Sequence, residues 1–136
     1  MKNWTQTLLE KEGYKIENAK ITSVDLSMAD HGCMTLSMVL EGSGWGCVYG
    51  GYVLGKGYVG AEPEFFEANG SGMVYLMRIM DIIECDHFNG MKGEYVRVAT
   101  KDCGDRIRII GHIMKDKWFD AESFFEDLKK ENENNG

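Results

Sequence analysis

The sequence predicts a single α+β domain over residues 1–136, an antiparallel sheet of about five strands with one long core helix packed on it and short terminal helices. Three observations lead to this prediction. Apolar and polar residues alternate in several extended segments, one internal segment has helical periodicity, and no composition break or repeat divides the chain. The chain is also long enough to bury a core of its own.

The N-terminal half is predicted to form a short helix and three strands. Residues 1–13 should hold the helix, which ends at Gly13, because glycine readily adopts the dihedrals that terminate a helix. The first strand should span 15–28, with a bulge near Thr22 because Ile21 is out of phase with the alternation that follows. An Asp-His-Gly turn at 30–32 should lead into strands over 33–40 and 44–54.

The C-terminal half is predicted to contain the core helix, two strands and a last helix. Apolar residues recur at spacings of three and four over 71–84, and Ser71 is the expected N-cap. Strands are expected over 95–100 and 106–114. Asp120 should cap a helix that reaches about residue 128, and 129–136 should form a flexible polar tail.

A glycine-rich stretch over 41–61 is the most unusual part of the chain, with eight glycines and aromatic residues between them. Glycine leaves a strand without side-chain bulk, so that another surface can approach it closely. Tyrosine and tryptophan are enriched among the residues that dominate protein interfaces. We therefore expect a partner-binding surface here, and the residues that would form it are Trp45, Tyr49, Tyr52 and Tyr58. The alternative is a bent strand whose rings fill the core.

No catalytic constellation is expected. Asp30-His31 and Asp86-His87 are neighbours in sequence, and adjacent side chains in an extended chain point apart, so neither pair forms a dyad. The glycine-rich stretch over 41–61 also lacks two features of a phosphate-binding loop, the Gly-Lys-Ser/Thr ending and a helix directly after it.

Neither a metal site nor a cofactor is expected. The four cysteines are Cys33, Cys47, Cys85 and Cys103, and none of them forms the close pair that is typical of zinc sites. We expect them to be reduced thiols without a catalytic role, because the strand cysteines have no basic neighbour in sequence.

Three arginines form a possible anion-binding or ligand-binding site. Arg97, Arg106 and Arg108 lie on strands that are predicted to pair, and His31 is added as a fourth candidate. The alternative is that these arginines pair with the chain's many carboxylates.

The net charge of −7 and the calculated pI near 4.9 limit the class of partner. Duplex DNA and anionic membranes bind proteins through clustered Lys and Arg, so we expect neither direct nucleic-acid binding nor membrane binding. An acidic surface can instead meet a basic groove on a protein, although such a charge also simply keeps a small protein soluble.

The N-terminus is not that of a signal peptide and no apolar run is long enough to span a bilayer, so a cytoplasmic protein is expected.

The chain resembles a group of small, uncharacterised accessory proteins encoded by phages and prophages of Firmicutes. The resemblance covers roughly residues 15–119 and is carried by Asp30-His31-Gly32, Gly50-Gly51-Tyr52-Val53-Leu54, Met77-Arg78-Ile79-Met80, Lys92-Gly93, Tyr95-Val96-Arg97-Val98, Ile110-Gly111-His112-Ile113 and Lys117-Trp118-Phe119. It implies a phage or prophage origin and action in the host cytoplasm, and it assigns no catalytic residue. Some phage proteins of this size inhibit host defence, anti-CRISPR proteins among them.

We therefore expect one of two functions. The first is a non-enzymatic binding protein that inhibits a host defence factor by occlusion, and the factor can be a basic effector that binds nucleic acid. The alternative is a homodimer that sequesters a small, nucleotide-like signal.

Overall fold

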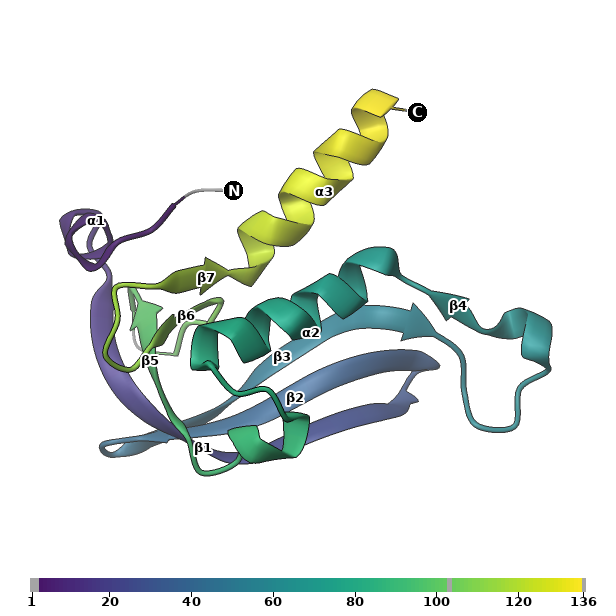
Figure 1. Ribbon diagram of the computed structural model, residues 1–136, viewed down its shortest axis with the longest axis horizontal. Coiled ribbons are helices and arrows are strands. Elements are labelled where there is room, and N and C mark those ends of the chain that lie inside the picture. The colour runs from purple at the N-terminus through teal and green to yellow at the C-terminus, as the bar shows by residue number, and fades with distance from the viewer. Residues whose placement is uncertain (1–2, 103, 136) are drawn as a thin grey trace.

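The computed structural model describes residues 3–102 and 104–135, and within them seven strands form one antiparallel sheet (Figure 1). The strand order across the sheet is β4-β3-β2-β1-β5-β6-β7. The strands are β1 (Lys15–Asp30), β2 (Cys33–Gly42), β3 (Trp45–Lys56), β4 (Glu67–Ala68), β5 (Tyr95–Thr100), β6 (Ile109–His112) and β7 (Trp118–Asp120), and the helices are α1 (Gln6–Lys11), α2 (Gly70–Ile83) and α3 (Ala121–Asn135).

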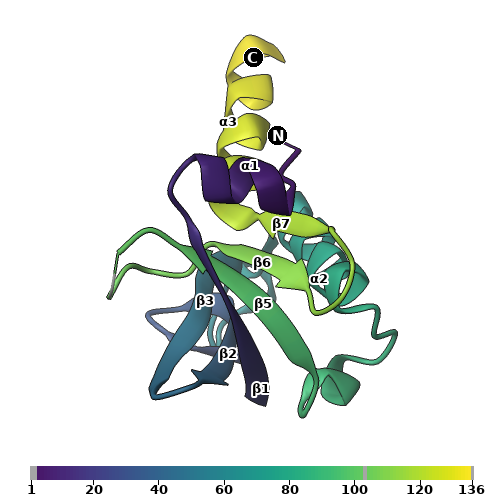
Figure 2. The ribbon, with the colours of Figure 1, turned by 90° about the vertical axis from the view of Figure 1, so that its left-hand side faces the viewer.

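The sheet is a half-barrel that curls around α2. The first half of β1 pairs with β5 and its second half pairs with β2, so this one long strand joins the two wings of the sheet. Helix α2 contacts β3 on one wing and β6 and β7 on the other, which places it in the hollow between them (Figure 2). The predicted sheet of about five strands under one long core helix is therefore wrong. Strands β4 and β7 have only two and three residues, too few to show a periodicity, and α2 is one of three short helices.

Large side chains fill the hollow of the half-barrel. Tyr49 of β3, Tyr75 of α2 and Phe119 of β7 have no exposed surface, and their rings belong to one cluster of buried residues. Helix α2 approaches the sheet closely at Gly72, where a Cβ atom would lie 2.6 Å from the carbonyl oxygen of Leu54. A side chain at this position would push the helix away from β3.

A second, smaller core lies where α1 covers the outer face of the β5–β6–β7 wing. It consists of Trp4, Leu9, Tyr14, Ala99, Ile109 and Trp118. Because consecutive strand residues point to opposite faces, Ile109 joins this outer core while Ile110 joins the inner one. Both faces of β6 are thus buried. Simple alternation is lost there, and the predicted strand over 106–114 is shorter in the structure.

Several local predictions are confirmed. The register of β1 against β2 shifts between Ile21 and Ser23, at the expected bulge, and the strand over 95–100 matches β5. Asp120 caps α3, because its Oδ1 accepts a hydrogen bond from the Ser123 N–H at 3.1 Å.

Other local predictions are corrected. The side chain that caps α2 is Asn69 rather than Ser71, since its Oδ1 accepts from the Ser71 N–H at 3.1 Å. Helix α3 continues to Asn135 through the segment that was expected to be a polar tail, and Gly136 lies outside the described residues. No helix in the described part of the chain is long and apolar enough to cross a membrane.

Candidate functional site

A projection formed by residues 57–69, here called the arm, is the most unusual surface of the molecule. The chain leaves β3 after Lys56, makes a loop and a 3₁₀ turn at Pro63–Phe65, and returns through β4 (Figure 1). Four of its large apolar side chains are exposed: Tyr58 by 56%, Val59 by 84%, Phe65 by 60% and Phe66 by 47%. Single exposed apolar residues are ordinary, but a cluster of this size marks an interaction surface.

The arm is held in shape by its own backbone and by one ring. Strand β4 pairs with the end of β3, and the Gly57 N–H donates to the carbonyl of Gly32 at 2.8 Å, which ties the arm to the β1–β2 turn. The ring of Phe66 lies directly against Gly57, where a Cβ atom would be 2.4 Å from its Cδ1. Gly57 also has a φ of 147°, a conformation that side chains rarely adopt. The arm therefore presents its apolar side chains from a defined backbone.

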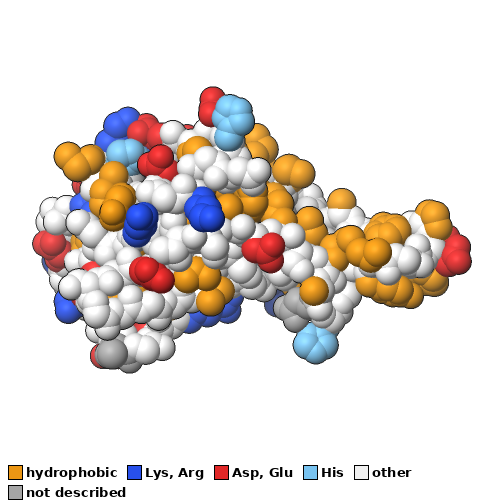
Figure 3. All heavy atoms as spheres, turned by 90° about the horizontal axis from the view of Figure 1, so that it is seen from below, with side chains coloured by type: hydrophobic (Ala, Val, Ile, Leu, Met, Phe, Trp, Pro, Cys, Tyr) orange, Lys and Arg blue, Asp and Glu red, His pale blue; other side chains and the backbone are white. Residues whose placement is uncertain are grey.

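The first half of α2 extends this apolar surface. Met73, Val74 and Met77 are exposed by 64%, 45% and 62%, and their spacing places them on one side of the helix. We call them the helix face. They follow the arm directly in the chain, because α2 begins immediately after Asn69. Figure 3 shows hydrophobic side chains over much of the narrow lobe and along the neck that joins it to the body.

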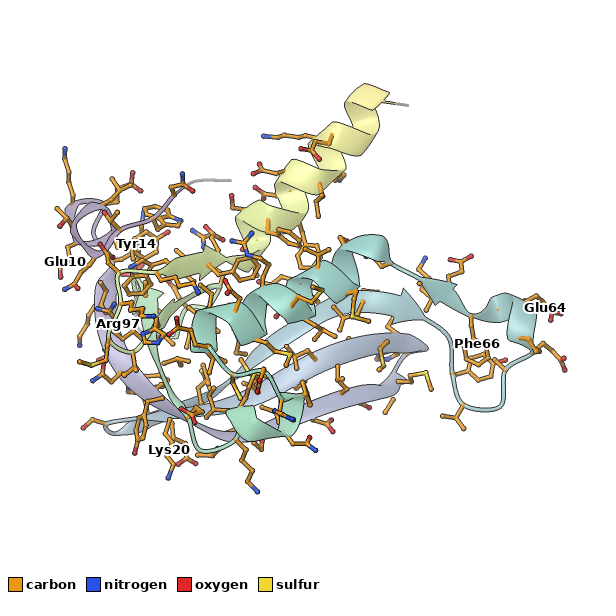
Figure 4. The ribbon with its side chains drawn as sticks, in the orientation of Figure 1. Glu10, Tyr14, Lys20, Glu64, Phe66 and Arg97 are labelled. Atoms are coloured by element: carbon orange, nitrogen blue, oxygen red, sulfur yellow. The ribbon has the colours of Figure 1, made fainter. Side chains whose placement is uncertain are left out.

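Charge on the arm has one sign. Residues 57–69 contain Glu62, Glu64 and Glu67 and neither Lys nor Arg. Figure 4 shows Glu64 at the outer end of the arm and Phe66 inside its loop. The arm thus combines exposed apolar side chains with exposed carboxylates, which suits an apolar surface that has basic residues near it.

The four residues predicted to bind a partner divide between core and surface. Tyr49 is completely buried and Tyr52 is half-buried, with its ring stacked on that of Phe125 at 5.2 Å. Trp45 is half-buried and packs on Gly42, where a Cβ atom would lie 2.1 Å from the indole. Tyr58 alone of the four lies on the arm. The alternative, a strand whose rings fill the core, therefore applies to Tyr49, and it applies in part to Tyr52, whose ring is half-buried.

Arg97 is occupied by bonds within the protein. Its Nε and Nη2 donate to the carbonyl oxygens of His112 and Lys115 at 2.8 and 2.6 Å, and its Nη1 donates to Gln6 Oε1 at 3.0 Å. The guanidinium also lies 4.6 Å from the centre of the Trp118 ring. This arginine joins β5, the β6–β7 loop and α1, so its position is explained by the fold.

Arg106 and Arg108 point to different partners. Arg106 lies 4.6 Å above the Tyr52 ring. Arg108 donates from Nη2 to the Tyr14 hydroxyl at 2.8 Å and lies 3.5 Å from Glu122 Oε2, and the Tyr14 hydrogen bond raises the pKa of Arg108. No contact of the three arginines among the described residues joins them into one anion site.

His31 lies far along the sheet from Arg97. It is exposed in the β1–β2 turn, with a φ of 52°. The residue opposite Arg97 on β1 is Asn18. At about 3.3 Å per residue, roughly 40 Å of strand separates Asn18 from His31.

A cleft of about 670 Å³ lies between the start of β3 and the β5–β6 loop. Trp45 and Ile107 contribute to its apolar wall, and its charged lining consists of Lys15, Lys101, Glu17, Asp102 and Asp105. Both lysines already have partners, since Lys15 pairs with Glu17 at 3.1 Å and Lys101 lies 4.9 Å over the Tyr14 ring. Carboxylates outnumber ammonium groups, so the cleft does not favour an anionic, nucleotide-like ligand.

The expectation that the Asp86 and His87 side chains point apart is wrong, because the chain bends at these residues and His87 Nδ1 lies 2.7 Å from Asp86 Oδ1. Both side chains are almost fully exposed, by 96% and 81%.

His112 and Glu84 form a second histidine–carboxylate contact, in which the histidine is largely buried. His112 Nδ1 accepts from the backbone N–H groups of Met114 and Lys115 at 3.0 and 2.9 Å, so the proton lies on Nε2, which is 2.8 Å from Glu84 Oε2. Both ring nitrogens are engaged, which leaves none to act as a base. Lys115 Nζ also contacts Glu84, and this contact is the largest cause of the lowered pKa of Glu84.

The thiols of the described residues lack the features of a reactive cysteine. Burial raises the pKa of the Cys47 thiol, which keeps it protonated and unreactive. Cys33 and Cys85 are also free thiols, and Cys103 lies outside the described residues. In the described ranges, no three His, Cys, Asp or Glu side chains gather as a metal site would require.

Comparison with protein-family models, curated proteins and solved structures finds no match to this chain. The candidate site therefore rests on its own geometry. The sequence contained one signal for it, the pair Phe65-Phe66 in an irregular segment, but helical periodicity made Met73 and Met77 look like core residues.

Proposed function

We propose that this chain is a non-enzymatic binding protein that acts by covering a surface of another protein. The observation that carries the proposal is the arm, with four large apolar side chains exposed on an ordered projection. Such a surface is costly to leave in water and gains free energy when a partner covers it. The three arginines and His112 make their contacts within the fold, and both lysines that line the cleft also have partners.

The arm also suggests the character of the partner. Its three exposed carboxylates share a short segment with the apolar side chains, so a complementary surface has an apolar area with Lys or Arg nearby. Grooves that hold nucleic acid are basic. Together with the resemblance to phage accessory proteins, this leads us to propose a host defence factor that binds nucleic acid as the target, inhibited by occlusion in the manner of an anti-CRISPR protein.

The test is affinity capture from a lysate of a bacterial host, with the captured proteins identified by mass spectrometry. Wild type is compared with Val59→Asp on the arm and with Val48→Asp, a matched control on β3 that is 63% exposed. We expect a basic protein to be captured by the wild type and by Val48→Asp and to be lost with Val59→Asp. Capture that survives Val59→Asp, or a wild type that captures nothing, contradicts the proposal.

A further inference from the structure

The apolar surface is large for a protein that stays alone in solution. The arm residues Tyr58, Val59, Phe65 and Phe66 and the helix face of Met73, Val74 and Met77 are exposed by 45–84%. For large apolar residues of roughly 150–200 Å² each, these fractions leave roughly 600–850 Å² per copy, which is about one side of a standard protein interface. Two copies together thus hold the area that a stable dimer needs.

The two halves of this surface differ in shape in a way that suits self-association. The arm projects from the body, whereas the helix face is the side of a straight helix next to it (Figure 1). In a two-fold symmetric dimer, a contact between surface A of one copy and surface B of the other occurs twice. We infer that the protein forms a homodimer in which the arm of each copy packs on the helix face of the other.

Charge is compatible with this arrangement. The first half of α2, residues 70–77, contains no charged side chain, so an arm that lies on it buries no unpaired charge of the helix. On the arm, Glu64 is at the outer end, where it can stay in water at the rim of the contact (Figure 4). The contact is therefore apolar at its centre and charged at its edge, as stable interfaces are.

The arm is also prepared for binding before it meets a second copy. Its backbone is fixed by the β3–β4 pairing and by the Gly57 N–H bond to Gly32, and Phe66 is seated on Gly57. An ordered segment loses less conformational entropy on association than a loose loop does.

Self-association would also regulate partner binding, and this part of the inference rests on the proposed function. The dimer covers the arm, so a partner that binds the arm must compete with the second copy. Apparent partner affinity should then fall as the concentration of this protein rises.

Sedimentation velocity over a wide range of protein concentrations tests the dimer with purified protein alone. We expect wild type and Val48→Asp to dimerise equally, and Val59→Asp and Met77→Asp each to weaken dimerisation by about tenfold or more. Circular dichroism of each variant verifies the fold, because both positions are exposed. A wild type that stays monomeric, or an arm variant that dimerises like the control, overturns the inference.

Mixing the two variants tests the arm-on-helix contact itself. Val59→Asp keeps its helix face and Met77→Asp keeps its arm, so the mixed dimer has one intact contact while each variant alone has none. We expect the mixture to associate more strongly than either variant. A mixture that associates no better indicates arm-to-arm packing and overturns the arrangement. Neither result bears on capture of a partner by the arm, so the two proposals can fail separately.

Discussion

The half-barrel core and the arm use the same kinds of side chain in opposite ways. Tyr49 and Tyr58 belong to one glycine-rich stretch, but Tyr49 has no exposed surface and Tyr58 is 56% exposed. The difference arises where the chain leaves the sheet. Strand β3 is paired with β2 as far as Lys56, and its inward rings meet α2 and α3, whereas the arm beyond Lys56 has no layer above it. An aromatic residue in this stretch therefore stabilises the fold before Lys56 and is available for recognition after it.

The strongest test of this comparison makes the same substitution in both regions. Tyr49→Ala removes a fully buried ring and leaves a cavity, so we expect it to lower the free energy of unfolding by about 3–5 kcal/mol. Tyr58→Ala removes an exposed ring, and we expect a change within about 0.5 kcal/mol. Urea denaturation followed by circular dichroism measures both. Equal losses would mean that the arm is part of the cooperative core.

The body of the fold could be predicted from the sequence where its elements are long. Strand β2 alternates between buried and more exposed residues from Leu36 to Glu41, and the bulge near Thr22 is visible in the sequence because Ile21 is out of phase. Strands β4 and β7 are too short to carry a pattern. The closure of the sheet into a half-barrel depends on α2 touching both wings, a long-range contact that no local pattern encodes.

The candidate site was harder to predict for a related reason. A run of apolar residues at helical spacing predicts a buried helix, and the pattern cannot tell that Met73 and Met77 face outward while Tyr75 and Ile79 face the core. Exposure is decided by which other elements are present to cover a face. The same limit applies to Tyr49, whose ring looked equally suited to an interface or to a core.

A smaller effect should follow from disturbing the arm at its base. Gly57→Ala places a Cβ atom where the Phe66 ring lies and strains a backbone with a φ of 147°. We expect a loss of about 1 kcal/mol in global stability, because the arm lies outside the core and can open locally without unfolding it. The arm itself should loosen, so chymotrypsin should cleave at Phe65 or Phe66 faster than in wild type.

Gly13→Ala is the control for this prediction. Gly13 also has a positive φ, 93°, but it lies at the end of α1, far from the arm in the chain. The Gly13→Ala substitution should lower global stability by a similar amount without increasing chymotrypsin cleavage at the arm. Equal cleavage in the two variants would indicate that global unfolding, rather than local opening of the arm, exposes these sites.

The smallest effect is expected at the edge of the body, where Glu84 joins the end of α2 to the β6–β7 loop. The contact with Lys115 lowers the pKa of Glu84 in the folded protein, and His112 also favours the ionised carboxylate. A carboxyl whose pKa is lower in the folded state stabilises the protein above its unfolded pKa of about 4.3, and this stabilisation is lost as the pH falls through the folded value.

Wild type should therefore be slightly more stable than Glu84→Gln at pH 7, and the difference should shrink in acid. Urea denaturation of both proteins, at pH 7 and at a pH below the unfolded pKa of Glu84, measures this difference in stability. A difference that grows on acidification would show that the ion pair does not hold α2 to the loop.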